Sequence, residues 1–272
     1  MEKGVANLIK AVIQARMGSS RLRAKVLKEV AGKPLLQLML ERVQCCRLIE
    51  GIIIATTVRE INDPIVDLTS KLNVEVFRGN EDDVLDRYYK AAKQFNIKTI
   101  VRLTSDCPLI DPQVTDRVVQ YYLDNQDRFD YVSNMHPPTF PDGLDTEVIP
   151  FDILERAWKE AKKPHEREHV TPYIWDNPEV FRIGNVENNE ELHLKERWTV
   201  DYEEDYLFVK QVYEHLYNAG RVFYMKDILE LLDRQPEIRK INQKYMGMNW
   251  WANEWNNLKT KNTLRALKKQ EG

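Results

Sequence analysis

A short segment near the N-terminus combines basic side chains with small ones. It follows the apolar run 9–13, which predicts a buried strand, and precedes a helical pattern that begins near Pro34. The segment holds four basic and three small residues: Arg16, Gly18, Ser19, Ser20, Arg21, Arg23 and Lys25. Small side chains let backbone N–H groups approach an anion that the basic side chains neutralise, so the segment predicts a polyphosphate site. A solvated basic loop is the alternative interpretation, since neither a P-loop nor a dinucleotide G-x-G-x-x-G motif is present.

Two aspartates follow predicted strands elsewhere in the chain. Asp106 comes soon after the apolar run 99–103, and Asp201 directly follows the predicted strand 197–200. Mg²⁺ takes one or two carboxylates together with phosphate oxygens and water, so the two aspartates could hold it. Asp106 alone would equally suit a helix cap. Together with the basic segment, the pair predicts a site for a nucleoside triphosphate and magnesium.

Two further motifs carry polar side chains. Asp145 and Glu147 alternate within the predicted strand 144–149, so they would face one side and accept hydrogen bonds from hydroxyls or an amine of a substrate. A solvated strand face explains the same alternation. Residues 165–169 match the zinc-protease pattern H-E-x-x-H, but two flanking prolines and the lack of a third ligand favour a polar helix start with one histidine near the site.

The elements that must position these residues alternate between strand and helix through the first half of the chain. Predicted strands are 9–13, 51–56, 74–77 and 99–103, and predicted helices are 34–48, a helix from 63, 82–95 and 111–123. This rhythm predicts a three-layer αβα fold with a mostly parallel sheet. Ligands of such sheets bind beyond the carboxyl ends of the strands, where the basic segment and Asp106 both lie.

The second half mixes turns, short strands and helices. Predicted strands are 131–134, 144–149, 180–183 and 197–200, and predicted helices are 151–162, 164–175 and 205–217. From Pro236 a cluster of tryptophans (Trp250, Trp251 and Trp255) is followed by a basic tail. We therefore predict a nucleotide-binding domain over 1–235 and a helical, Trp-rich, basic appendage over 236–272. The tryptophans suit a packing or dimer surface, and we expect a homodimer.

Composition excludes several classes of function. The 272 residues are 43% hydrophobic and 31% charged, as in soluble globular proteins, and the net charge of −3 favours neither nucleic acid nor membrane as a partner. No apolar run reaches the length of a membrane span, and the start of the chain does not look like a signal peptide. The three cysteines, Cys45, Cys46 and Cys107, form no disulfide framework, so we expect a cytoplasmic protein.

Several motifs together resemble the spore-coat-polysaccharide-type cytidylyltransferases, relatives of the CMP-Kdo and CMP-sialate synthetases. The resemblance spans roughly residues 8–215, and its motifs lie at 13–25, 32–36, 55–57, 76–89, 102–112, 142–148 and 167–174. It implies the Rossmann-like nucleotide-diphosphosugar-transferase fold with a mixed, mostly parallel sheet. It also implies Mg²⁺-dependent transfer of CMP from CTP to an acidic sugar or small phosphorylated acceptor, with release of pyrophosphate, in surface polysaccharide biosynthesis.

The resemblance also implies roles for residues. For the nucleotide we expect nine: Ala15, Arg16, Gly18, Ser19, Ser20, Arg21, Lys25, Thr104 and Asp106. Arg16, Lys25 and Asp106 are the expected catalytic residues, and Asp106 and Asp201 the expected metal ligands. Glu147, Glu168 and His169 are expected on the acceptor side, together with Asp145 from the alternation described above.

One position departs from the family pattern. The family usually has Leu-Pro-Gly-Lys where this chain has Leu22-Arg23-Ala24-Lys25, and alanine restricts the positive φ that glycine allows. Two other functions stay open. A glycosyltransferase of the same fold would want an Asp-x-Asp motif after the strand 99–103, where this chain has Ser105-Asp106-Cys107. A nucleotide-binding assembly protein without catalysis would tolerate the altered loop.

Overall fold

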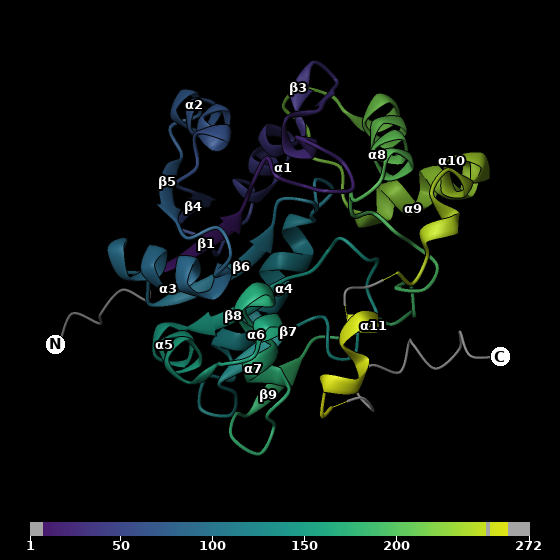
Figure 1. The fold of residues 1–272 in the computed structure, drawn as a ribbon. Helices are drawn as coiled ribbons and strands as arrows, with labels where there is room; N and C mark the ends of the chain where they lie inside the picture. Colours follow the sequence, from purple (N-terminus) through teal and green to yellow (C-terminus); the bar gives the residue numbers. More distant parts are fainter. Residues whose placement is uncertain (1–7, 249–250, 261–272) are drawn as a thin grey trace, which may run out of the picture.

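The computed structural model describes residues 8–248 and 251–260, and a seven-stranded sheet runs through its centre (Figure 1). The strands, in the order they lie in the sheet, are β5 (Glu75–Gly79), β4 (Gly51–Thr57), β1 (Ile9–Gln14), β6 (Thr99–Thr104), β8 (Glu147–Pro150), β7 (Tyr131–Ser133) and β9 (Ile183–Asn185). The first four are parallel, whereas β8 runs antiparallel to both β6 and β7. The predicted mixed, mostly parallel sheet is confirmed.

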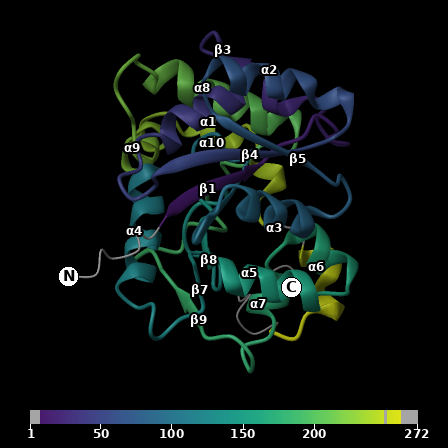
Figure 2. The same ribbon diagram turned by 90° about the vertical axis from the view of Figure 1, so that its left-hand side faces the viewer.

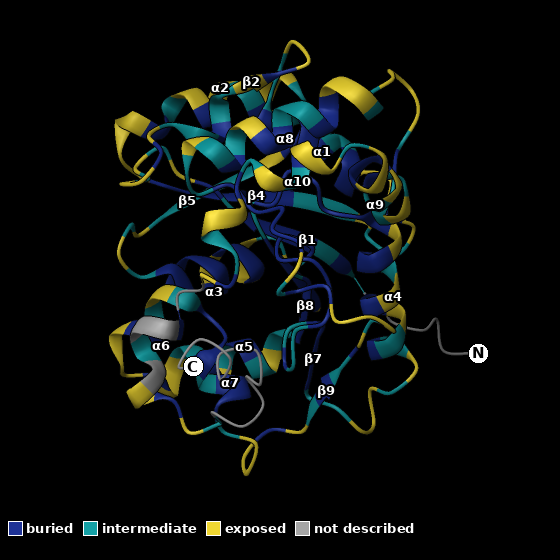
Figure 3. Cartoon of the chain, turned by 90° about the vertical axis from the view of Figure 1, so that its right-hand side faces the viewer, coloured by how far each residue is buried: buried dark blue, intermediate teal, exposed yellow. Residues whose placement is uncertain are grey.

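Helices cover both faces of this sheet, which gives the predicted three layers (Figure 2). One face carries α1 (Leu35–Val43), α2 (Asp63–Lys71), α4 (Pro112–Leu123), α8 (Glu203–Leu216) and α9 (Met225–Arg234). The other carries α3 (Val84–Gln94), α5 (Phe151–Glu160), α6 (Pro164–His169) and α7 (Pro172–Trp175). Side chains of β1 alternate between the two cores, with Ala11 and Ile13 in the first and Val12 in the second. The central strands β1, β6, β8 and β7 are accordingly mostly buried (Figure 3).

Short elements complete the chain. A small hairpin of β2 (Glu29–Val30) and β3 (Lys33–Pro34) precedes α1, and three 3₁₀ turns are η1 (Lys25–Leu27), η2 (Glu60–Asn62) and η3 (Gln243–Tyr245). Beyond α9 follow α10 (Pro236–Lys240), α11 (Trp251–Glu254) and η4 (Trp255–Asn257). No helix within the described residues is both long and apolar enough to cross a membrane.

The end of the described chain passes from one helical layer to the other; we call residues 241–248 and 251–260 the C-terminal strap. It starts after α10, which packs on α8 and α9, and its Trp251 and Leu258 are buried in the core of the opposite face. Its far end is held by Asp176, whose carboxylate accepts hydrogen bonds from the backbone N–H of Lys259 and Thr260 at 2.8 Å each. Trp250 and the basic tail from 261 lie outside the described residues, and the division at 235/236 stays a prediction.

Two predicted strands differ from the structure because their backbone groups bond elsewhere. Segment 197–200 is extended but forms no strand, since Trp198 N donates to Asp142 O at 2.7 Å and Val200 N to Asp106 O at 2.8 Å, on two different segments. The strand predicted at 180–183 begins only at Ile183, because Val180 is still in a turn closed on Asn177 O.

Two further boundaries were wrong. The strand predicted over 144–149 starts at Glu147. Before that residue, the side chain of Asn134 bonds Leu144 O and Thr146 N and replaces the backbone hydrogen bonds that a neighbouring strand would make. Asp145 therefore precedes the strand, and Asp145 and Glu147 do not alternate along it. The single helix predicted over 164–175 is broken into α6 and α7 at Val170, whose φ of 74° cannot continue a helix.

Candidate functional site

The structure brings Lys25, Asp106 and Asp201 together beyond the carboxyl ends of β1 and β6. Lys25 Nζ donates to Asp106 Oδ2 at 3.3 Å, to Asp201 Oδ1 at 3.0 Å and to the backbone oxygen of Val200 at 2.6 Å. Three acceptors match the three protons of an ammonium group. The basic segment and the two predicted metal ligands therefore form one site, although they lie far apart in the sequence.

Backbone hydrogen bonds to Asp106 place Asp201 in this site. Asp106 O accepts from Val200 N at 2.8 Å and from Thr199 Oγ1 at 3.2 Å, so the segment before Asp201 is fixed against the turn that follows β6. The turn itself is closed by Cys107 N donating to Thr104 O at 3.1 Å. Asp201 thus reaches the sheet edge through this docking rather than from the end of a strand.

Both carboxylates have cationic partners without any metal. Asp201 Oδ1 also contacts Arg21 at 2.7 Å, and its Oδ2 contacts Arg197 at 3.3 Å. Burial would raise the pKa of Asp201, but Lys25 and Arg21 outweigh burial and lower it to about 2. Burial likewise opposes the charge of Lys25, but Asp106 and Asp201 raise its pKa above the ordinary lysine value. Asp201 and Lys25 are therefore both charged at neutral pH.

Arg197 is a buried cationic partner of Asp201. It is 2% exposed, and its guanidinium also contacts Asp142 at 3.0 Å and Asp205 at 3.0 Å. Its NH1 group donates to the backbone oxygen of Met248 at 3.2 Å, so the C-terminal strap is tied to the same group. Sequence reasoning missed Arg197, because the burial that makes it important arises only from tertiary packing.

The rest of the basic segment leaves cations available to a ligand. Arg16 and Arg23 are exposed, and neither forms an ion pair with a described residue. Ser20 is also exposed, whereas Ser19 Oγ accepts from Leu22 N at 3.3 Å and shapes the loop. The other predicted nucleotide contacts frame the same edge: exposed Gly18 lies in the loop, buried Ala15 just past the end of β1, and half-buried Thr104 at the end of β6.

Of the residues predicted to contact the acceptor, Glu147 is already bonded to other side chains, whereas Asp145 is not. Glu147 is buried, and its carboxylate accepts from Arg102 and from Tyr131 Oη, the latter at 2.5 Å. Burial raises the pKa of Glu147, but Arg102 together with hydrogen bonds from Thr171 and Tyr131 outweighs burial and lowers it. Asp145 is half-buried and makes no hydrogen bond or ion pair with a described residue. Burial, together with the charges of Asp142 and Glu147, raises the pKa of Asp145 well above its usual range. Because no described residue forms a hydrogen bond or ion pair with Asp145, its carboxyl group is open to a ligand.

The remaining acceptor candidates lie on α6. Glu168 is exposed, and His169 is the half-buried last residue of the helix. Burial, followed by the charges of Arg102 and His165, lowers the pKa of His169 to about 3, so its imidazole is neutral at pH 7. His165 Nδ1 lies 3.4 Å from Glu254 of the C-terminal strap. Arg102 was also missed from the sequence, although one arginine inside an apolar strand is a usable signal.

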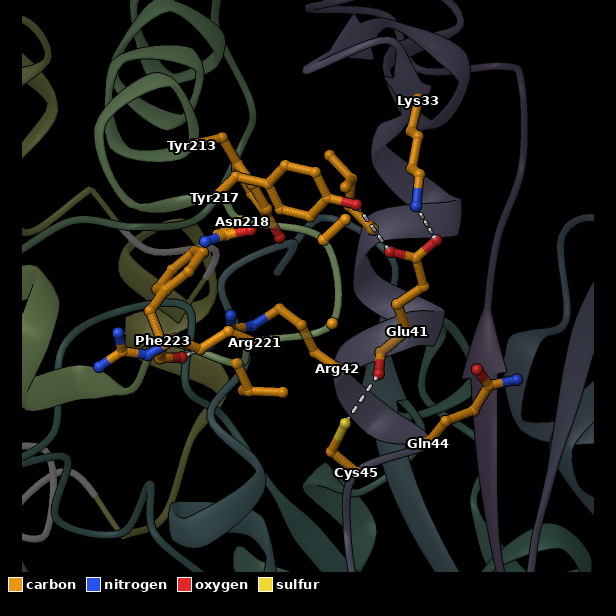
Figure 4. Close-up of a pocket in the computed structure, with 14 residues that line it drawn as sticks. Lys33, Glu41, Arg42, Gln44, Cys45, Tyr213, Tyr217, Asn218, Arg221 and Phe223 are labelled. Carbon is orange, nitrogen blue, oxygen red and sulfur yellow. Dashed lines mark hydrogen bonds and ion pairs between the residues drawn. The ribbon is translucent and has the colours of Figure 1, made fainter.

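A separate hollow of about 370 Å³ lies along the outer side of α1 (Figure 4). It is lined by α1, the end of α8 and residues 218–223, and contains none of the predicted site residues. Three of its polar groups satisfy one another, since Glu41 accepts from Lys33 at 2.7 Å and from Tyr217 at 3.4 Å. The cluster of Lys25, Asp106 and Asp201 therefore remains the candidate functional site.

Known proteins share both the sequence and the fold of this chain. The family profile described as Cytidylyltransferase matches residues 10–240. The chain belongs to the cytidylyltransferase family. It is 32% identical to the spore coat polysaccharide biosynthesis protein SpsF of Bacillus subtilis, over 85% of this chain and 96% of that protein. It is 41% identical to the uncharacterized protein MJ1063 of Methanocaldococcus jannaschii, over 85% of this chain and 93% of that protein.

A solved cytidylyltransferase from Leptospira borgpetersenii is similar over most of the fold. It is 36% identical, with a TM-score of 0.81 over 86% of this chain and 97% of that one. These matches confirm the family and fold predicted from the sequence motifs. The C-terminal strap begins just beyond residue 240, where the match to the cytidylyltransferase profile ends.

Among the described residues, the donor set of this cytidylyltransferase fits magnesium better than zinc. Asp106 and Asp201 offer hard oxygens around one cation position, and no cluster of three or more histidine, cysteine or acidic side chains that could hold a metal occurs in the described part of the chain. Mg²⁺ takes few carboxylates and completes its shell with phosphate oxygens and water. A site with two carboxylates therefore suits a metal that arrives with a triphosphate.

The departure from the family's glycine lies at a strained position. Ala24 has φ 53° and ψ 25°, in the left-handed region that glycine enters freely. This conformation costs a non-glycine residue about 1–2 kcal/mol of stability. Glycine removes that cost, but it also gives the unfolded chain more conformational freedom, which offsets about 0.4–1 kcal/mol of the gain. We expect Ala24→Gly to raise the free energy of unfolding by about 0.5–1 kcal/mol in urea titrations, without weakening CTP binding.

Ala31 provides the matched control, since its φ is 50° in the β2–β3 turn. Ala31→Gly should change stability similarly and leave nucleotide binding untouched. A destabilised Ala24→Gly variant, or one that binds CTP more weakly, would show that the loop requires alanine.

Proposed function

We propose that this family member transfers CMP from CTP to an acidic sugar or small phosphorylated acceptor and releases pyrophosphate. The observation that carries the proposal is the position of Lys25 between Asp106 and Asp201, beside a loop with two unpaired arginines. The name of the relative SpsF supports a place in surface polysaccharide biosynthesis. We also propose that the protein acts in the cytoplasm as a homodimer.

The chemistry we propose is an in-line displacement at the α-phosphorus of CTP. An acceptor oxygen forms the new bond to this phosphorus, the bond to the β-phosphate oxygen breaks, and pyrophosphate leaves. A hydroxyl acceptor releases its proton to water, and an ionised acceptor has none to release. Lys25 and Arg16 stabilise the leaving pyrophosphate, and positioning with charge neutralisation supplies most of the acceleration.

Asp106 and Asp201 would hold Mg²⁺ together with phosphate oxygens. When bound, the metal supplies positive charge at the transferring phosphoryl group. Ala15, Gly18, Ser19, Ser20, Arg21 and Thr104 would line the nucleotide.

The acceptor would lie on the β8 and α6 side of the site. Asp145 is the open carboxylate there, so it would accept hydrogen bonds from acceptor hydroxyls or from an amine. Neutral His169 and exposed Glu168 would contribute further polar contacts. Glu147 would act through Arg102, because its carboxylate is already engaged by that guanidinium and by Tyr131.

We expect Lys25→Ala to weaken CTP binding roughly tenfold or more, because a charge-assisted phosphate contact is worth roughly 1.5–3 kcal/mol. Titration calorimetry with Mg²⁺ and CTP measures the change. Lys28→Ala is the control, since Lys28 pairs with Glu203 and contacts neither Asp106 nor Asp201. Equal CTP affinity in wild type and Lys25→Ala would remove Lys25 from the nucleotide site.

A screen of pyrophosphate release tests the function itself. Four nucleoside triphosphates are combined with a panel of acidic sugars and small phosphorylated compounds, with and without Mg²⁺. We expect release only with CTP, metal and one acceptor class. Consumption of a nucleotide sugar instead would indicate a glycosyltransferase, and CTP binding without any release would indicate a non-catalytic binding protein.

A further inference from the structure

Lys25 holds its ammonium between the two carboxylates that we propose as metal ligands. Its side chain is only 12% exposed, and its ammonium contacts one oxygen of each proposed metal ligand as well as Val200 O. The backbone at Lys25 is fixed, because η1 is closed by Leu27 N donating to Ala24 O and the next side chain, Val26, is buried. Any movement of the charge therefore comes from the flexible side chain, which carries its ammonium on four methylene groups.

The local charges balance without any metal. The carboxylates of Asp106 and Asp201 face two cations, Lys25 and Arg21, within contact distance. Arg197 also contacts Asp201, but it is shared with Asp142 and Asp205. A divalent ion that entered alone would meet the Lys25 ammonium at close range and would be repelled. A triphosphate changes this balance, because its oxygens offer Lys25 new partners.

We infer that Lys25 is an internal counter-ion that fills the magnesium position of the free protein, so that metal binds only when a triphosphate draws the ammonium away. The inference rests on the proposed function, and it implies that nucleotide and metal bind together rather than metal first. Arg16 and Arg23 are exposed and unpaired, so they can contact the phosphates while Lys25 still holds the two carboxylates.

The experiment titrates Mn²⁺ alone and follows free Mn²⁺ by electron paramagnetic resonance. Wild type should show no tight site without nucleotide. Lys25→Met should bind one Mn²⁺ per chain, with affinity raised roughly tenfold or more, because the competing charge is gone. Lys28→Met is the matched control, as it removes the same charge from a lysine paired with Glu203, and it should behave as wild type.

Two further variants keep the test decisive. Lys25→Gln removes the charge but retains an amide donor for Val200 O, so it should show the same gain if Lys25→Met folds poorly. Lys25→Met with Asp106→Asn should lose the new Mn²⁺ site. Tight binding of Mn²⁺ alone by wild type, or no gain in either folded Lys25 variant, would overturn the inference. Failure of the proposed function would appear separately, as wild type that does not bind CTP in calorimetry.

Discussion

Asp106→Asn and Asp201→Asn should each lower Mg²⁺-dependent turnover of CTP by roughly 10²–10³-fold, the range found when one charge-stabilising group is removed from an active site. Asparagine keeps the shape of aspartate and removes the negative charge. The loss should appear as pyrophosphate release at saturating CTP with the acceptor found in the screen. Glu203→Gln is the control, because Glu203 is an exposed carboxylate at the start of α8 that pairs with Lys28, and its turnover should be unchanged.

The two variants should differ in stability. Among the described cationic side chains, Asp106 contacts only Lys25, so Asp106→Asn should unfold near the wild-type urea concentration. Asp201 contacts Lys25, Arg21 and Arg197, so Asp201→Asn should lose about 1–3 kcal/mol of stability, as expected when a charged hydrogen-bond partner is removed. Near-normal turnover in a folded variant would exclude that residue as a metal ligand.

Arg197→Met should destabilise the protein by about 3–5 kcal/mol, the cost of breaking a buried ion-pair network at one partner. The substitution leaves Asp142, Asp201 and the fully buried Asp205 without their shared cation. Urea unfolding followed by tryptophan fluorescence measures the loss. Arg182→Met is the control, because Arg182 pairs with Asp130 at the surface, where such pairs contribute about 0–1 kcal/mol.

The loss in Arg197→Met should shrink as pH falls. Burial raises the pKa of Asp142 to about 7 even though Arg197 opposes this rise, so loss of Arg197 should raise the pKa further. The unfolded chain then binds fewer protons than the folded chain, and the variant's stability decreases as pH increases. The difference from wild type should therefore be smaller at pH 5 than at pH 8. A pH-independent difference would show that Arg197 acts through packing alone.

The sequence was most informative where residues act through local patterns. The apolar runs and the Asp-Pro helix starts correctly placed β1, β4, β6, α2 and α4. The basic segment lies beyond the end of β1, as the sequence predicted. The strand predicted before Asp201 was wrong, because Asp106 O binds that segment across the fold and no local pattern encodes such a bond. The Lys25 contacts to both aspartates depend on the same tertiary docking.

The acceptor side shows the same limit of local reasoning. Asp145 and Glu147 looked equivalent in the sequence, yet Glu147 is locked to Arg102 and Tyr131 while Asp145 is open. The difference arises because Asn134 replaces the strand ladder around Asp145, and the strand begins two residues later. Hydrogen bonds from a side chain that replace backbone strand pairing cannot be predicted from a local sequence pattern, because they form only between segments that the fold brings together.

Crystals grown with CTP and Mn²⁺ test the central claim most directly, because anomalous scattering locates the metal independently of the protein. The account predicts one Mn²⁺ in contact with both Asp106 and Asp201 and with phosphate oxygens, the triphosphate against the loop from Arg16 to Lys25, and the Lys25 ammonium on the phosphates. A triphosphate bound elsewhere, or a metal away from both aspartates while Lys25 still bridges them, would contradict it.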